Sequence, residues 1–315
     1  LTGTPIENNL EELWSQFAVL NPGMLGDLNQ FRESFSIPIS KNKDKTATRQ
    51  LKKIVYPFIL RRLKKDVAKD LKDRKDYTIY VEMNKKQKIL YQQTKEFYKK
   101  VLLDKIDDEG INKSRFKILE GLLRLRQIAC SPQILPKGDK TIESEKLKVL
   151  LERVKEIVKS DNKILIFSQF TSMLDLIRKA LEKEKIKHLY LTGQTTIKKR
   201  EQMVKEFQSK DNKDLNVFLI SLKAGGTGLN LTNASYVFIF DPWWNPAAEQ
   251  QAIDRTHRIG QEKQVFTYKL VTKDTVEEKI LELQEQKKEL VKNVISTDTS
   301  LIKSISKKDI SSLFG

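Results

Sequence analysis

The run Lys163-Ile164-Leu165-Ile166-Phe167 decides the fold class of this chain, because consecutive apolar residues of this length are typical of a strand buried on both faces. An amphipathic helix is expected before it, from Ser144 onward. Helical and apolar segments alternate after it, at residues 171–183, 188–192, 197–208, 216–221 and 235–240. Strands that alternate with helices predict an α/β fold with a parallel sheet flanked by helices. Such sheets bind ligands at the carboxyl ends of their strands, so we expect functional residues there.

The sequence outside this α/β region is mainly helical. A capping box at Thr4–Glu7 starts an apolar-periodic helix that Asn21-Pro22-Gly23 ends. A lysine-rich helical region follows, in which one alternating run at 77–81 predicts a strand. A further strand at 265–271 precedes a long C-terminal helix. The expected domains are residues 1–27, a large basic helical insertion at 28–140, the α/β domain at 141–272, and the last helix and tail at 273–315.

The charge balance predicts a polyanionic partner, with nucleic acid as the first expectation. Lysine and arginine number 59 against 42 aspartate and glutamate, which gives a net charge of +17. Residues 41–75 alone hold 14 basic and 4 acidic residues. The alternatives are a lysine-rich proteome and a solvated helical face without a defined partner. No apolar stretch has the length of a membrane helix, so no membrane partner is expected.

The cysteine and histidine content predicts neither a disulfide framework nor a metal site. Cys130, the single cysteine, lies in an apolar-periodic run and should be buried, which fits a reducing cytoplasm. His188 and His257 lie far apart without neighbouring cysteines or paired carboxylates, so no structural metal is expected. The low cysteine content, together with abundant lysine and isoleucine, favours a prokaryotic source.

A glycine-rich segment follows one of the predicted strands. Within Ser221–Asn230, three glycines occur in four positions, and they let the backbone approach an anion closely. Ordinary tight turns share this composition, so the segment alone does not identify a ligand.

A pair of arginines follows the next predicted strand. Asn245 and the proline after it predict the start of a helix that carries Arg255 and Arg258. Arginines spaced i,i+3 project from one helical face and can clamp a polyphosphate. The alternative is a pair of surface arginines partnered by Asp254 or Glu249.

Four segments, taken together, closely resemble the late helicase motifs of the SWI/SNF-type ATPases, a branch of the superfamily-two helicases. They are Leu1–Asn8, Ile164–Phe170, Ser221–Asn230 and Gln251–Gln261. The intervening segments Pro57–Arg62, Leu125–Ile128 and Asp241–Pro246 also fit that family. The resemblance runs over nearly the whole chain, and its last motif is very specific.

The resemblance implies that this chain is the second of two RecA-like lobes, which close on ATP while double-stranded DNA lies across both. Residues 1–27 would carry the last motif of the first lobe, 28–140 the family's insertion, and the C-terminal helix would brace the two lobes. The first lobe would precede this chain in cis, because no Gly-Lys-Ser or Gly-Lys-Thr of a phosphate-binding loop occurs here. ATP and Mg²⁺ are the implied cofactors, with Mg²⁺ held mainly by that first lobe and no metal bound by this chain.

The resemblance also implies roles for individual residues. Arg255 and Arg258 match the catalytic arginines offered to the nucleotide, with Arg258 as the arginine finger. Residues implied in ATP binding or in coupling it to DNA are Gly226, Thr227, Gly228, Asn230 and Gln251. Residues implied in DNA binding are Ser168, Gln169, Thr192, Gly193, Lys223, Trp244, Arg61 and Arg62. For Trp244 a core position is an equal alternative, and for Arg61 and Arg62 a solvated helical face is.

The implied function is that of the C-terminal lobe of an ATP-dependent translocase or remodeller of double-stranded DNA with little sequence preference. Without the first lobe the chain should not hydrolyse ATP. The alternative is a non-catalytic DNA-binding or scaffold module that retains a helicase fold, and a strand-separating helicase is a rival within the enzyme class. The expected location is cytoplasmic, at the nucleoid in a prokaryote. DNA-bound proteins, nucleosomes and RNA polymerase all remain open as cargo.

Overall fold

The computed structural model describes residues 10–42, 44–59, 68, 70–209, 211–212, 214–225 and 229–293. These residues form two compact units that divide near residue 63, with a second division within the last helix near residue 281. Outside the described residues lie the predicted capping box at Thr4–Glu7 and the candidate site residues Arg61, Arg62, Gly226, Thr227 and Gly228.

The N-terminal unit is a small cluster of helices with a core of its own. Its elements are α1 (Leu10–Leu20), α2 (Leu28–Phe31), a π-helical turn (Arg32–Ser36), α3 (Ile37–Asn42), α4 (Lys45–Val55) and a 3-10 turn (Tyr56–Phe58). Leu10, Leu13 and Phe17 form the buried face of α1, as their helical spacing predicts. They pack in one cluster with the fully buried Phe31. Gly23, at φ +80°, lies in the turn after α1, where a left-handed backbone favours glycine.

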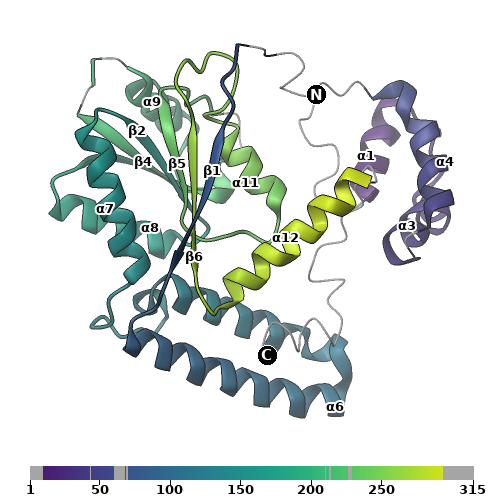
Figure 1. The fold of residues 1–315 in the computed structure, drawn as a ribbon. Coiled ribbons are helices and arrows are strands. Elements are labelled where there is room, and N and C mark those ends of the chain that lie inside the picture. Colours follow the sequence, from purple (N-terminus) through teal and green to yellow (C-terminus); the bar gives the residue numbers. More distant parts are fainter. Residues whose placement is uncertain are drawn as a thin grey trace. The chain divides into compact units, whose positions relative to one another are not determined.

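The second unit is built on a six-stranded sheet in the order β1-β6-β5-β2-β4-β3, and every neighbouring pair is parallel (Figure 1). Its strands are β1 (Lys75–Val81), β2 (Lys163–Ser168), β3 (Lys187–Leu191), β4 (Leu215–Ser221), β5 (Ala234–Ile239) and β6 (Phe266–Thr272). Its helices are α6 (Lys85–Cys130), a 3-10 turn (Pro132–Ile134), α7 (Glu145–Lys159), α8 (Thr171–Lys183), α9 (Ile197–Gln208), α10 (Leu222–Gly225) and α11 (Pro246–Ile253). The last helix, α12 (Val276–Asn293), starts in this unit. The parallel sheet flanked by helices is thus confirmed. The short strand predicted at 77–81 is its edge strand β1, although the expected boundaries assign those residues to the helical insertion.

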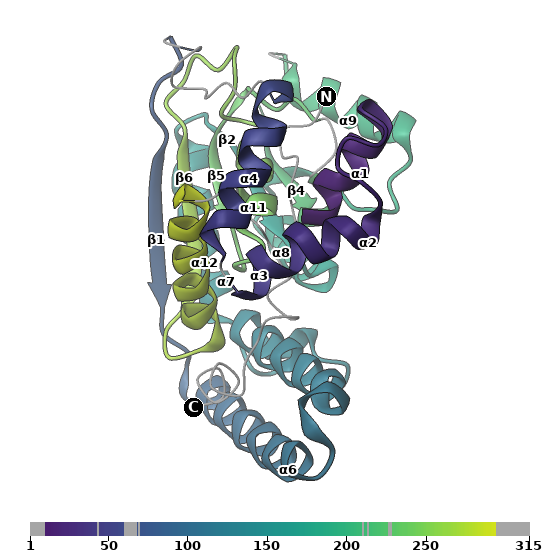
Figure 2. The ribbon, with the colours of Figure 1, turned by 90° about the vertical axis from the view of Figure 1, so that its right-hand side faces the viewer.

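The long helix α6 folds back on itself. The side-chain amide of Gln87, near its start, donates to the carbonyl of Ile128, near its end, at 2.7 Å. Figures 1 and 2 both show the two arms of α6 running side by side. The second arm returns to the sheet, and Cys130 at its end is fully buried, as its apolar run predicts.

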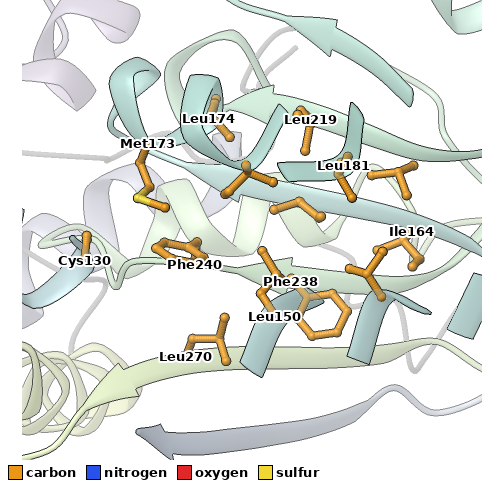
Figure 3. Packing of buried hydrophobic residues seen from close by; sticks show 14 of the residues in the cluster. Cys130, Leu150, Ile164, Met173, Leu174, Leu181, Leu219, Phe238, Phe240 and Leu270 are labelled. Atoms are coloured by element: carbon orange, nitrogen blue, oxygen red, sulfur yellow. The ribbon is translucent and has the colours of Figure 1, made fainter. Parts of the chain in front are cut away.

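Two apolar layers hold the helices against the sheet. Alternate residues of a strand point to opposite faces, so Ile164 and Ile166 of β2 pack with α7 and α8, whereas Leu165 and Phe167 pack with α9 and α11. Figure 3 shows the first layer, with Cys130 at the end of the cluster where Phe240 lies. Because both faces are covered, the central strands are apolar along nearly their whole length.

Candidate functional site

The carboxyl ends of the parallel strands meet at one edge of the sheet, which we call the carboxyl edge. Ser168 ends β2, Thr192 follows β3, Lys223 follows β4 and Asp241 follows β5. The fold therefore brings together, along this edge, residues that lie far apart in the sequence.

Asp241 is the buried centre of the carboxyl edge. It is fully buried, its Oδ1 accepts a hydrogen bond from the Ser168 hydroxyl, and its Oδ2 accepts one from the backbone amide of Gln169 at 3.2 Å. Nη2 of Arg126 lies 3.8 Å from Oδ2. Burial raises the pKa of Asp241 to about 7, while Arg126 and the two hydrogen bonds oppose that shift. The Ser168 side chain thus supports the loop after β2 from inside and does not face solvent.

Arg126 reaches two segments of the carboxyl edge from α6. Its Nη1 donates to Oε1 of Gln169 at 2.9 Å, and its Nη2 donates to the carbonyl of Pro242. Its Cζ lies over the rings of Phe170 and Trp244, 5.7 Å from each centroid. Trp244, for which the sequence left two roles open, is half-buried and packs on this guanidinium.

The segment between β5 and α11 is held by two further side chains. Glu249 is buried, accepts a hydrogen bond from the Trp243 amide at 2.6 Å, and pairs with Lys269 of β6. Asn245 caps α11 as predicted, since its Oδ1 accepts from the amide of Ala247 at 2.9 Å. Glu249, considered above as a partner of the arginines, thus joins the start of α11 to β6.

The remaining described candidates after β3 and β4 lie nearer to solvent. The amide of Thr192 donates to Oγ1 of Thr195 at 3.1 Å, which closes the loop after β3, and Gly193 in that loop is exposed. Lys223 on α10 and Asn230 further along are exposed as well. These groups can meet a ligand from solvent, which the buried hydroxyl of Ser168 cannot.

The helix predicted to carry both arginines ends earlier than expected. α11 stops at Ile253 with Asp254 as its C-cap, so Arg255 and Arg258 lie in the turn that follows and not on one helical face. After Ile253 the backbone tightens, since the amides of Arg255 and Thr256 donate to carbonyls three residues earlier, and the Arg255 carbonyl accepts from the amide of Leu231 at 2.9 Å. Burial lowers the pKa of Arg255, and the positive charge of Arg258 lowers it further, so the two guanidinium groups are within electrostatic reach.

This arginine turn, residues 254–260, lies toward the other edge of the sheet. Nε2 of Gln261 donates to the carbonyl of Ala234, the first residue of β5, at 2.8 Å. Nε2 of His257 lies 2.9 Å from the carbonyl oxygen of Lys72, which precedes β1. A six-residue strand such as β5 spans about 20 Å, so the arginine turn and the carboxyl edge are two separate sites. Gln251 is half-buried on α11, which connects them in sequence.

Two properties of the described residues bear on membranes and metals. None of their helices combines the length and the apolar character needed to cross a bilayer. Within the same part of the chain, no three His, Cys, Asp or Glu side chains gather where they could hold a metal ion.

Comparison with known proteins establishes the family. The family model of the SNF2-related domain matches residues 1–134, and that of the helicase conserved C-terminal domain matches residues 145–260. The solved C-terminal domain of the Sulfolobus solfataricus SWI2/SNF2 ATPase is 32% identical, with a TM-score of 0.62, over 76% of this chain and 98% of that domain. The chain belongs to the SWI2/SNF2 family of ATPases. Its parallel sheet is the RecA-like sheet of this family, as the sequence predicts.

Two further relatives show how much of a SWI2/SNF2 protein this chain represents. The core of the S. solfataricus ATPase, solved in complex with double-stranded DNA, is 37% identical with a TM-score of 0.64, over 99% of this chain and 65% of that one. An uncharacterized ATP-dependent helicase of Mycoplasma genitalium is 39% identical over the whole of this chain and 29% of its own length. The chain thus spans about a third of the length of the curated relatives that it matches.

Sequence reasoning did not assign Arg126, Asp241 or Glu249 to the site. A signal for Arg126 was present, because this arginine interrupts an apolar-periodic run of α6 in which Leu125 and Ile128 are buried. Asp241 could have been found from its position directly after a buried strand. Glu249 could have been found from its spacing, since it lies three and four residues before Ala252 and Ile253 and shares their buried face of α11.

Proposed function

We propose that the protein to which this chain belongs hydrolyses ATP when bound to double-stranded DNA and steps along the DNA as two lobes open and close. This chain would supply the arginines for the nucleotide and contacts to the DNA backbone. Membership of the SWI2/SNF2 family supports the use of ATP, and the DNA complex of a 37% identical core supports the partner. The first lobe, with the phosphate-binding loop, would act in cis. Such a motor would work in the cytoplasm, at the nucleoid in a prokaryote, and move DNA-bound proteins.

The observation that carries this proposal is the backbone hydrogen bond between Leu231 and Arg255. The segment after β4 starts at the carboxyl edge with Lys223 and continues in sequence to Leu231, whose amide donates to the Arg255 carbonyl at 2.9 Å. A displacement of the arginine turn on nucleotide binding can therefore act on a segment that begins at the carboxyl edge, where we propose that DNA binds. This link supports the coupling role proposed for Gly226, Thr227, Gly228, Asn230 and Gln251.

The arginine turn suits a polyphosphate. Burial lowers the pKa of Arg255 and the charge of Arg258 lowers it further, so a bound anion would stabilise both guanidinium groups. Guanidinium donors match phosphate oxygens in geometry and charge. We assign Arg258 to the charge that develops on the transferred phosphoryl group and Arg255 to holding the nucleotide in place. Mg²⁺ would neutralise charge on the β- and γ-phosphates, with its protein ligands in the first lobe.

The carboxyl edge suits the DNA backbone. Gln169, Thr192, Gly193, Lys223 and Trp244 would position phosphates without distinguishing bases. Arg61 and Arg62 would add electrostatic attraction, while Ser168 would hold the loop from inside. Binding should therefore be nearly sequence-blind and should weaken steeply as salt rises. An affinity that does not change with salt would contradict backbone binding.

The test is ATP hydrolysis by the full-length protein with and without duplex DNA. Arg258→Ala should lower DNA-stimulated turnover by about 10³–10⁵-fold, the usual effect of losing an arginine finger. Arg153→Ala is a matched control, because that arginine pairs only at the surface of α7, with Glu156 at 3.0 Å. It should leave turnover unchanged. The isolated chain should bind DNA weakly and hydrolyse no ATP.

The possible results separate the alternatives. Turnover in the Arg258→Ala variant equal to wild type removes the finger assignment. Turnover that is also indifferent to DNA favours a non-catalytic scaffold module. Release of a labelled strand from a duplex would identify a strand-separating helicase, whereas translocation without release supports the proposal.

A further inference from the structure

Arg126 is a buried cation on α6, far in sequence from the strand ends of the carboxyl edge and from the arginine turn. It is 3% exposed, and its neighbours on the same helix face, Leu122 and Ala129, are buried apolar residues. Buried arginines are uncommon unless their charge is paired. The counterion here is Asp241, which is itself fully buried and lies 3.8 Å away. The pair therefore sits inside the protein, beneath the carboxyl edge.

The contacts of Arg126 include two of the proposed DNA contacts on this edge, Gln169 and Trp244. Nη1 of the guanidinium donates to Oε1 of Gln169, in the loop after β2, at 2.9 Å. Nη2 donates to the carbonyl of Pro242, and the face of the guanidinium packs on the ring of Trp244, two residues later in the sequence. One side chain from α6 thus fixes two segments that are about 70 residues apart in sequence.

This arrangement also determines which polar group of the Gln169 side chain is left without a hydrogen-bond partner. Because its Oε1 accepts from Arg126, the orientation of the amide is set. Its Nε2 then has no hydrogen-bond partner among the described residues. This Nε2 is itself buried, whereas Gln169 as a whole is half-buried, so Arg126 anchors the end of the side chain while the rest of the residue and its loop stay accessible to a ligand.

The chemistry of this site requires a guanidinium. A planar fork can donate in two directions and stack on aromatic rings at the same time, whereas a lysine ammonium is a point charge without a face. Lysine at position 126 could still neutralise Asp241. It could not bridge Gln169 and Pro242 while packing between two rings.

We propose that Arg126 is a positioning residue for DNA binding, which holds Gln169 with its loop and the Trp244 ring in the arrangement that meets the DNA backbone. Arg126 itself is too buried to touch DNA and acts through these two residues. The inference rests on the proposed function and deepens it. Fixing two contacts before DNA arrives removes part of the ordering penalty of binding.

The test compares Arg126→Lys and Arg126→Ala with Arg124→Ala in the full-length protein. Arg124 lies on the same helix, and its Nη1 donates to Oε1 of Gln127, its neighbour on that helix, at 3.0 Å, so it is a matched control. ATPase activity is titrated with duplex DNA and, separately, with ATP at saturating DNA. Arg126→Lys should raise the half-saturating DNA concentration about tenfold, the effect of one lost charge-assisted hydrogen bond. The KM for ATP should stay within about twofold, because the arginine turn lies elsewhere.

A double-mutant cycle adds a readout that a merely structural role would not move. In a Gln169→Ala background, Arg126→Lys should raise the half-saturating DNA concentration by much less than in wild type. Equal effects in both backgrounds, or no effect beyond that of Arg124→Ala, would overturn the proposal. If both Arg126 variants fail to fold, Arg126 is a core residue and the proposal is wrong. A wild-type protein that ignores duplex DNA refutes the proposed function, and this inference with it.

Discussion

Replacing Lys146 with methionine should lower the free energy of unfolding by about 3–5 kcal/mol, because Glu277 then remains charged and unpaired inside the protein. The two side chains are 1% and 0% exposed, and Nζ of Lys146 lies 2.5 Å from Oε2 of Glu277. Nζ also donates to the carbonyls of Phe240 and Leu270, at 3.3 Å each. The single substitution removes these three contacts and the contact of the ammonium group with the Phe240 ring, 5.5 Å from its centroid.

Removing both charges should be less harmful than removing one. In the double variant Lys146→Met/Glu277→Leu no buried charge remains, and apolar side chains of similar size fill the space. The main remaining loss is the acceptor of the Thr272 amide, which donates to Glu277 at 2.8 Å. A buried amide without an acceptor costs about 1–3 kcal/mol. The double variant should therefore lie between wild type and Lys146→Met in stability.

The assay is urea unfolding of the purified chain, followed by the fluorescence of the tryptophans in the second unit. Lys148→Met is the matched control, since Lys148 lies on the same helix but pairs at the surface with Glu143 at 2.7 Å. It should not change the unfolding midpoint measurably. A Lys146→Met variant as stable as this control would refute the reasoning. So would a double variant less stable than the single one.

Two further predictions concern titratable groups of the core. Burial raises the pKa of Asp241 from 3.8 to about 7, so the folded protein keeps this proton to higher pH than the unfolded chain. Its contribution to stability is therefore full below the unfolded pKa and is lost as the pH rises through about 7. Ser168→Ala should raise this pKa further, because the hydroxyl stabilises the carboxylate; a carboxyl ¹³C titration that shows a lower value would contradict this. Burial also raises the pKa of the Cys130 thiol well above its usual range, so a maleimide should label Cys130 only after denaturation, as mass spectrometry can show.

The sequence predicted the sheet well because its central strands are buried on both faces. Residues such as Ile164 and Leu165 face different helix layers, so no polar residue interrupts their run and the strand pattern is strong. The edge strand β1 was found from its alternating pattern. Its place in the sheet was not, because pairing with β6 depends on a partner almost 200 residues away.

The sequence could not predict the pairing of buried charges or the end of α11. Lys146 and Glu277 have ordinary positions in amphipathic helices, and only the packed structure shows that they lie together at 1% and 0% exposure. Helix periodicity continued through Arg255. After Ile253 the chain changes to a tight turn whose Arg255 carbonyl bonds to Leu231, and tertiary hydrogen bonds of this kind leave no local signal.

The buried charges form one layer beneath the carboxyl edge. After burial itself, the groups that act on the pKa of the Cys130 thiol are Asp241, Lys146, Glu277 and Arg126, which places four charges around one buried atom. Apolar residues of similar volume are expected to be at least as stable as such buried pairs. They would, however, leave Gln169 and Trp244 without the group that orients them. The Arg126–Asp241 pair is therefore explained by the way it holds Gln169 and Trp244 at the carboxyl edge. Lys146 and Glu277 instead join α7 and the start of α12 to β6 and to Phe240, which follows β5.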